Sequence, residues 1–230
     1  MKLLCVADHV DPLVYSNGCK SRFQDVELVI SAGDLPMEYL GFIASTLNKP
    51  VLFVFGNHNL SALKRFRRPG GSITGDIGAN FTNYYGATSV DGRIRKVKGL
   101  LVAGLGGSIQ YNGGEHQFTE FQMITRILKL VPRLLWNRLI HGRFLDILVT
   151  HAAPRGINDA EDKPHVGFKA FLWFMRRFRP QYLLHGHIHL YDLNADRYGS
   201  YEDTTVINVY DHYVLEMSED GSGERSGSVH

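Results

Sequence analysis

Cysteine is scarce in this chain, whose 230 residues include only Cys5 and Cys19. Two cysteines supply neither a disulfide framework nor the spacing of a zinc finger, so the fold must rest on its hydrophobic core. Long apolar runs are also missing, because no window approaches the ~18 to 20 residues of a membrane-spanning helix. The apolar stretch before Asp8 is too short for the core of a signal peptide. We therefore expect a cytoplasmic protein that has no membrane partner.

An excess of charge of one sign is missing as well. The chain has 25 Lys and Arg against 23 Asp and Glu, a formal charge of +2, which is weaker than the footprint of a dedicated nucleic-acid binder. Two short basic runs remain, which we interpret as solvated helix ends. Either run could instead attract a phosphate substrate, which allows a nucleotide without requiring one. The runs are Arg65, Arg67 and Arg68, and Arg176, Arg177 and Arg179.

Length and composition suit one globular domain, since 44% of the residues are hydrophobic and 21% are charged. From Ser218 onward the chain is almost free of apolar side chains. We expect a single domain over residues 1–217 and a disordered tail over residues 218–230.

Short apolar runs rich in β-branched residues recur along the chain. They lack polar alternation, which is typical of strands buried on both faces. Stretches of helical character lie between them, at residues 37–47 and 168–178, and this alternation predicts an α/β fold with parallel crossovers. The predicted strands are Leu3 to Ala7, Leu28 to Ala32, Val51 to Phe55, Ile147 to Thr150 and Tyr182 to Leu184.

A second sheet is predicted to begin in the region rich in Gly, Asn and Thr between residues 70 and 114. Two strand-like runs there, residues 93–97 and 100–105, are separated by a turn near Gly99. A helix is expected over residues 115–131. Closing strands are expected over residues 206–210 and 213–217.

Polar side chains follow each of the five predicted strands. Each has an ordinary explanation when taken alone, because Asp and Asn favour turns and a lone His is commonly a satisfied polar residue. The carboxyl ends of parallel strands meet at one sheet edge, however, where ligands bind. Oxygen and nitrogen ligands without thiolate suit Mn, Fe or Zn, and a bridging carboxylate would hold two ions ~3.5 to 4 Å apart. The residues are Asp8, Asp34, Asn57, His58, His151, His187 and His189.

Four motifs carry a family resemblance: Gly33-Asp34, Gly56-Asn57-His58, Thr150-His151 and Gly186-His187-Ile188-His189. In this order they resemble the successive signatures of the calcineurin-like metallophosphoesterase superfamily, over residues 3 to about 210. The resemblance implies a four-layer α/β/β/α sandwich with two mixed β-sheets and two divalent metal ions. It also implies hydrolysis of a phosphomonoester or phosphodiester by in-line attack of a metal-bound hydroxide.

The resemblance assigns a role to each motif residue. Asp34 would bridge the ions, Asp8 and His189 would bind the first, and three residues would bind the second: Asn57, His151 and His187. His58 would not bind metal but would assist the leaving group. An imidazolium near the leaving oxygen can donate a proton, which contributes roughly 10²- to 10⁴-fold.

The first motif departs from the Asp-x-His that this family usually has. Asp8 is followed by His9, Val10 and Asp11, so the expected histidine is Val10, which cannot bind metal. Three outcomes are open: His9 or Asp11 is recruited, the first ion is held by fewer protein ligands and water, or one tightly bound ion suffices. We favour the second.

Further residues are candidates for shaping the site. The run from Gly104 to Ser108 is glycine-rich but lacks the Lys-Ser/Thr ending of a P-loop, so we interpret it as a turn near the site. His116 and His165 are candidate substrate contacts.

Two rival functions stay open. Val10 favours a catalytically weakened or inactive phosphoesterase-like module that binds another protein. A metal-binding sensor without turnover would share the ligands. The retention of His58 and of the Gly-His-x-His pair favours the enzyme, because a scaffold needs neither.

Overall fold

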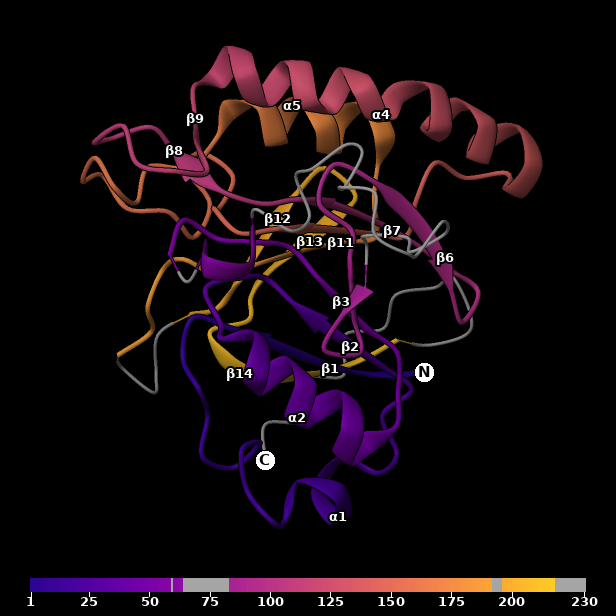
Figure 1. Ribbon diagram of the computed structural model, residues 1–230. Coiled ribbons are helices and arrows are strands. Elements are labelled where there is room, and N and C mark those ends of the chain that lie inside the picture. The colour runs from indigo at the N-terminus through magenta and orange to yellow at the C-terminus, as the bar shows by residue number, and fades with distance from the viewer. Residues whose placement is uncertain (59, 64–82, 192–195, 218–230) are drawn as a thin grey trace, which may run out of the picture.

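The computed structural model describes residues 1–58, 60–63, 83–191 and 196–217. Two six-stranded sheets face each other, and helices cover the outer side of each sheet (Figure 1). This confirms the predicted four-layer α/β/β/α sandwich with two mixed β-sheets. The basic run at Arg65, Arg67 and Arg68 and the predicted tail at residues 218–230 lie outside the described residues.

The first sheet has the strand order β14-β1-β2-β3-β5-β4. Its central strands β1, β2, β3 and β5 run parallel, whereas β14 and β4 are antiparallel to their neighbours. The strands are β1 (Lys2–Ala7), β2 (Leu28–Ser31), β3 (Val51–Phe53), β4 (Asn83–Tyr84), β5 (Ala87–Ser89) and β14 (Asp211–Glu216).

The second sheet has the order β12-β13-β11-β10-β7-β6. Strands β7, β10, β11 and β13 are parallel, and β6 and β12 are antiparallel edge strands. The strands are β6 (Ile94–Val97), β7 (Leu100–Leu105), β10 (Ile147–Thr150), β11 (Tyr182–His185), β12 (Tyr198–Tyr201) and β13 (Thr204–Asn208). A separate pair joins β8 (Ser108–Ile109) to β9 (Gln117–Phe118).

Helices α1 (Cys19–Phe23) and α2 (Met37–Leu47) cover the first sheet, and α4 (Glu120–His141) and α5 (Lys169–Phe178) cover the second (Figure 1). A short 3-10 helix spans Leu60–Ala62. Within the described ranges, each helix is too short or too polar to cross a membrane.

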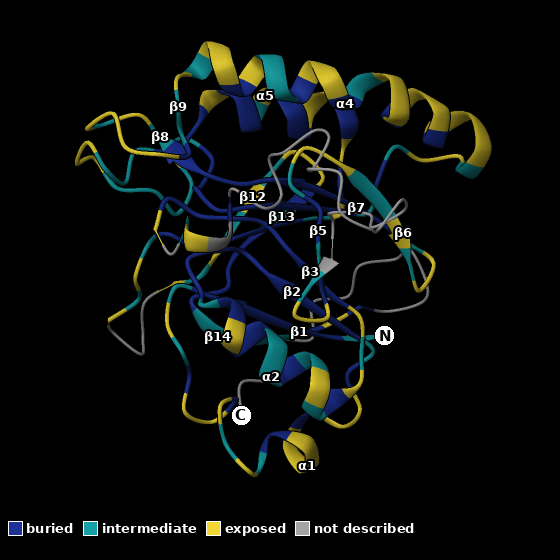
Figure 2. Ribbon diagram, in the orientation of Figure 1, coloured by how far each residue is buried: buried dark blue, intermediate teal, exposed yellow. Residues whose placement is uncertain are grey.

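Alternate residues of the central strands enter different apolar layers. In β1, Leu3 and Cys5 belong to the core between the sheets, whereas Leu4 and Val6 belong to the core beneath α1 and α2. Figure 2 shows most of the length of these strands as buried. Strands buried on both faces need apolar side chains at every position, which explains the continuous apolar runs of the sequence.

The boundaries of α2 agree with the prediction, but those of α4 do not. Helix α4 begins at Glu120 instead of residue 115, because the side chain of Thr119 accepts a hydrogen bond from the N–H of Gln122 and forms a capping box. The helix continues through Pro132, which is exposed, and ends where Gly142 adopts φ 72°. Pro132 therefore does not terminate the helix.

Several smaller boundaries also differ from the prediction. Strand β13 spans Thr204–Asn208 instead of residues 206–210, and β14 begins at Asp211 instead of residue 213. The turn at Gly99 is confirmed, since Lys98 and Gly99 both have positive φ between β6 and β7. Helix α1 and strands β4, β5, β8, β9 and β12 were not predicted because they are short and weakly patterned.

Both thiols are expected to be unreactive in the folded protein. Burial raises the pKa of Cys5 far above its usual range and raises the pKa of Cys19 as well, so little reactive thiolate forms. We expect Ellman's reagent to label neither thiol in native buffer and to label both after unfolding in guanidinium chloride. Rapid labelling of two thiols without denaturant would contradict the packing of β1 and α1.

Candidate metal centre

The carboxyl ends of parallel strands from both sheets meet at one edge of the molecule. Asp8 follows β1, Asp34 follows β2 and Asn57 follows β3, all in the first sheet. His151 follows β10 and His187 follows β11, which are adjacent in the second sheet. The topology therefore places side chains from distant parts of the chain at one sheet edge, as the pattern of strands and polar residues predicts.

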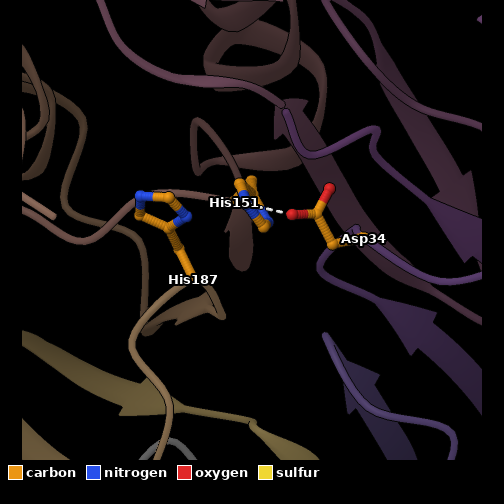
Figure 3. Close-up of side chains that lie close together, drawn as sticks. All are labelled: Asp34, His151 and His187. Carbon is orange, nitrogen blue, oxygen red and sulfur yellow. Dashed lines mark ion pairs between the residues drawn. The ribbon is translucent and has the colours of Figure 1, made fainter. Parts of the chain in front are cut away.

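Asp34, His151 and His187 form the centre of this site. One ligand atom from each lies within 4.8 Å of the others, and all three side chains are buried (Figure 3). The Nε2 atom of His151 is 3.2 Å from Oδ2 of Asp34. This spacing is compatible with one divalent ion bound among the three side chains.

His151 is oriented by the backbone of the opposite sheet. Its Nδ1 donates a hydrogen bond to the carbonyl oxygen of Ala32 at 2.9 Å, so its Nε2 faces Asp34 and lies 3.0 Å from Oδ1 of Asn57. The Nδ2 atom of Asn57 donates to the hydroxyl of Tyr111 at 3.2 Å, which turns the amide oxygen toward the site. A metal-binding histidine is typically fixed in this way, with its second ring nitrogen donating to a carbonyl.

Asp34 and His151 behave as a buried ion pair. Burial acts to raise the pKa of Asp34, but His151 and the N–H of His58 outweigh burial and hold this pKa at about 2. Burial acts to lower the pKa of His151, but Asp34 outweighs burial and raises this pKa to about 9. Without a metal, the proton on Nε2 of His151 therefore points at the oxygens of Asp34 and Asn57. A divalent cation in the same place would bind these oxygens instead.

His187 presents a neutral imidazole to the site. Burial, with His151 nearby, lowers the pKa of His187 to about 3. Its Nε2 donates to the carbonyl oxygen of Pro164 at 2.8 Å, which leaves Nδ1 as the ring nitrogen able to bind metal. Neutral imidazole is the form of histidine that binds metal ions.

Asp8 provides the test of whether a cation fits. Its Oδ2 accepts a hydrogen bond from the N–H of His187 at 2.8 Å, but its buried Oδ1 has no partner among the described residues. Burial raises the pKa of Asp8 to about 6. A buried oxygen without a partner is costly, and a cation beside it removes that cost. The site therefore fits a divalent metal ion.

The backbone around the site is strained and closely packed. Asp8, Asp34 and His187 have φ values of 66°, 56° and 68°, a region that costs of order 1–3 kcal/mol for a residue with a side chain. A Cβ atom on Gly56 would lie 2.0 Å from Oδ1 of Asp34, and one on Gly186 would lie 2.3 Å from Oδ2 of Asp8. These two motif positions therefore require glycine.

The residues that follow Asp8 in the first motif lie apart from the cluster. Val10 packs against the core beneath α1 and α2. His9 is exposed, and its Nδ1 lies 2.7 Å from Oδ1 of Asp211. Asp11 accepts one hydrogen bond from the N–H of Leu13 and another from His212. Neither His9 nor Asp11 is brought to Asp34, so recruiting either one would require breaking its present contacts.

His189 also lies outside the cluster. It is exposed, its Nδ1 is 2.8 Å from the hydroxyl of Tyr191, and its ring is 4.9 Å from that of Tyr210. The structure thus assembles the residues predicted for the second ion, but it leaves those predicted for the first ion incomplete.

His58 and His165 lie beside the cluster. The backbone N–H of His58 donates to Oδ1 of Asp34 at 2.7 Å, and its side chain is exposed. The ring of His165 is 5.1 Å from that of His187, and its Nδ1 is 2.6 Å from Oδ2 of Asp162. The side chain of His58 is exposed and that of His165 is half-buried.

His116 has a different position from the one predicted. It is buried, and its two ring nitrogens face protein acceptors: the carbonyl oxygen of Gly56 at 2.7 Å and Oδ2 of Asp91 at 3.1 Å. A ring with both nitrogens engaged in this way cannot contact substrate. The structure instead makes His116 a residue that positions the turn before Asn57.

Asp91 and Arg126 extend this arrangement. Arg126 pairs with Asp91 and also donates to the carbonyl oxygen of Gly106 at 2.6 Å. Burial opposes ionisation of Asp91, but Arg126 and His116 outweigh it and hold the pKa of Asp91 well below its usual range. The glycine-rich run is a turn in contact with the site, since the N–H of Gly107 donates to the carbonyl oxygen of Phe55 at 2.8 Å. Sequence patterns did not reveal this network, because Asp91 and Arg126 are 35 residues apart and share no motif.

Comparison with known proteins identifies the family and agrees with the fold. The profile of the family described as calcineurin-like phosphoesterase matches residues 3–191. A crystal structure of TT1561 of Thermus thermophilus is 13% identical and has a TM-score of 0.58, covering 91% of this chain and 89% of that one. The phosphopantetheinyl hydrolase of Mycobacterium tuberculosis is 13% identical and has a TM-score of 0.57, covering 98% of each chain. No curated protein matches the chain in sequence.

Replacement of His116 tests the positioning network. We expect His116→Ala to lower the free energy of unfolding by about 1–3 kcal/mol, because Asp91 and the carbonyl of Gly56 lose a buried donor. Urea titration followed by circular dichroism measures this loss. His141→Ala, at the end of α4, should change the value by no more than about 0.5 kcal/mol. Equal stability of the His116→Ala variant and the wild type would contradict the role of His116.

Proposed function

Because the chain belongs to the calcineurin-like phosphoesterase family, we propose that it is a metal-dependent phosphoesterase that hydrolyses a phosphomonoester or phosphodiester. The observation that carries the proposal is the buried cluster of Asp34, His151 and His187. An interaction module does not need a buried ion pair and a neutral histidine converging on one point. The two unpaired thiols are compatible with action in the cytoplasm.

The arrangement supports two binding sites of unequal strength. Asp34, Asn57, His151 and His187 would hold one ion tightly, because their orientations are already fixed by neighbouring groups. Asp8, Asp34 and His189 would hold a second ion with help from water, and more weakly because His189 lies outside the cluster. Mn, Fe or Zn suits these ligands. Such ions neutralise the phosphoryl oxygens and lower the pKa of bound water.

His58 would supply the proton that the leaving group needs. Its N–H holds Asp34, which places the exposed imidazole next to the candidate metal site. His165, whose ring lies beside that of His187, would contact the rest of the substrate. The substrate class we propose is a phosphate ester, and a nucleotide is compatible with it.

The second candidate is an interaction module with weakened or lost catalysis. The packing of Val10 against the core favours it, because a metal ligand expected in the first motif is absent. The two candidates differ in one measurable property, which is turnover by the metal-loaded protein.

Metal binding distinguishes the two sites. We expect equilibrium dialysis against Mn²⁺ to give one tightly bound ion per chain and a second that binds at least about tenfold more weakly. His187→Ala should remove the tight ion, whereas His189→Ala should spare it and weaken the second. Two equally tight ions, or a tight ion lost in His9→Ala, would contradict our assignment of ligands.

Turnover tests the proposed function directly. We expect the Mn-loaded protein to hydrolyse bis-p-nitrophenyl phosphate, p-nitrophenyl phosphate or both. His58→Ala should lower kcat by about 10²-fold or more with metal content unchanged, and the loss should be larger on phenyl phosphate, whose leaving oxygen is more basic. His141→Ala serves as the control.

Each outcome of these assays decides one point. Absence of turnover with every divalent ion, in protein that binds metal, would overturn the enzyme in favour of a non-catalytic role, either the interaction module or a metal-binding sensor. Wild-type rates for His58→Ala on all three esters would remove His58 from the reaction.

A further inference from the structure

Helix α4 has an apolar outer surface as well as an apolar inner one. Its inner side chains, including Met123, Ile127 and Leu134, are buried against the second sheet. A helix that packs on a sheet normally presents polar residues to solvent. Here Phe121 is 77% exposed and Leu139 is 76% exposed, and Figure 2 shows much of the outer side of α4 as exposed. The exposed apolar set is Phe121, Ile124, Leu128, Leu135, Trp136, Leu139 and Ile140.

The same layer carries a large net positive charge. Residues 120–143 and 169–179, which include α4 and α5, contain nine Lys and Arg and one carboxylate, a formal charge of +8. The whole chain is +2, so the remaining residues carry −6. The single carboxylate, Glu120, already accepts hydrogen bonds from the N–H groups of Lys169 and Ala170. The layer therefore has a strong charge that the composition of the whole chain conceals.

Arginines gather in a hollow of about 510 Å³ at the C-terminal ends of α4 and α5. Arg138 and Arg177 lie over the ring of Phe144, at 5.8 and 5.6 Å, and neither has a carboxylate partner in the described part of the chain. The other three arginines each pair with one carboxylate: Arg143 with the largely buried Asp146, and Arg176 and Arg179 with the exposed Glu202 and Asp203. The hollow is lined by Arg138, Arg143, Phe144, Arg176, Arg177, Phe178 and Arg179. It includes the second basic run of the sequence, which the candidate metal centre does not use.

We propose that this surface, the exposed apolar set of α4 together with the arginine hollow, docks on an anionic lipid bilayer. The aliphatic and aromatic side chains would enter the boundary between headgroups and acyl chains, and the arginines would contact lipid phosphates. Helix α4 would lie along the membrane without crossing it, because Lys129, Arg133 and Arg138 interrupt its apolar sequence. The sequence led us to expect no membrane partner because it contains no spanning run, and surface binding does not need one.

The combination of chemistries favours lipid over other occupants. A second copy of the chain would bring one layer of charge +8 against another. A nucleic acid would neutralise the arginines but would leave Leu128, Leu135 and Leu139 without an apolar environment. A bilayer that contains anionic lipid satisfies both the apolar and the charged side chains.

Vesicle co-sedimentation tests the proposal with the full chain. We expect the protein to pellet with vesicles of phosphatidylcholine mixed with phosphatidylglycerol, and not with vesicles of phosphatidylcholine alone. Raising the salt concentration should weaken binding, since the charged contacts are exposed. Binding to both vesicle types alike, or to neither, would overturn the proposal.

Matched pairs of variants test whether vesicle binding depends on this surface or only on the net charge and hydrophobicity of the protein. Arg138→Glu with Arg177→Glu should weaken binding to anionic vesicles by at least about tenfold. Lys20→Glu with Lys49→Glu makes the same change in net charge on the opposite layer and should leave binding within about twofold. Leu128→Gln with Leu139→Gln should also weaken binding by at least about tenfold, whereas Leu13→Gln, at an exposed leucine elsewhere, should not. Thermal melting by circular dichroism confirms that each variant is folded.

The alternative occupants give different results. A dimer in sedimentation velocity that the leucine variant dissociates, without vesicle binding, would assign the surface to a second copy. Tight binding of a single-stranded oligonucleotide, lost with Arg138→Glu and Arg177→Glu while vesicles do not bind, would assign it to nucleic acid. An equal loss of vesicle binding in the Lys20→Glu and Lys49→Glu control would show that the attraction is non-specific and would overturn the proposed docking site. None of these measurements depends on phosphoesterase activity.

Discussion

The buried imidazole of His151 is the contact on which the site depends. It comes from the second sheet, yet its hydrogen-bonding partners, Ala32, Asp34 and Asn57, follow strands of the first sheet. The core between the sheets is otherwise formed by apolar side chains, which attract without fixing direction. His151 therefore supplies a directional link between the two sheet edges, beside the hydrogen bonds from the N–H of His187 to Asp8 and from the N–H of Gly107 to Phe55. Removing any of its partners would leave a buried polar group unsatisfied.

The local sequence around this link follows from the space available. Gly56 and Gly186 allow backbone to approach the carboxylates of Asp34 and Asp8 more closely than any side chain would permit. Asp8, Asp34 and His187 adopt strained φ values, which persist only because the surrounding packing holds them. The network of Asp91, Arg126 and His116 holds the turn before Asn57 from behind. The packing of the fold thus holds the candidate metal ligands in a strained arrangement that is compatible with binding a cation.

Sequence reasoning was most reliable where one local cause determines the structure. Continuous apolar runs revealed the central strands because burial on both faces leaves no polar position. The polar residues after these strands revealed Asp34, His151 and His187 because parallel strands bring their ends to one edge. It failed for His116, which joins Asp91 and Gly56 from separate parts of the chain. His189, which stays a predicted ligand, lies outside the cluster, and its side chain contacts Tyr191 and Tyr210.

The order of the strands has a consequence for how the protein is made. The first sheet contributes Asp8, Asp34 and Asn57 to the candidate metal centre, and these leave the ribosome well before His151 and His187. An unfinished chain therefore has the oxygen donors of the centre but not its nitrogen donors. Capture of an ion such as Zn²⁺ or Mn²⁺ by the complete set must wait until the second sheet has been synthesised and packed. For the metal-dependent enzyme that we propose, metal loading would therefore be a late step of biosynthesis that requires both halves of the sandwich to have folded together.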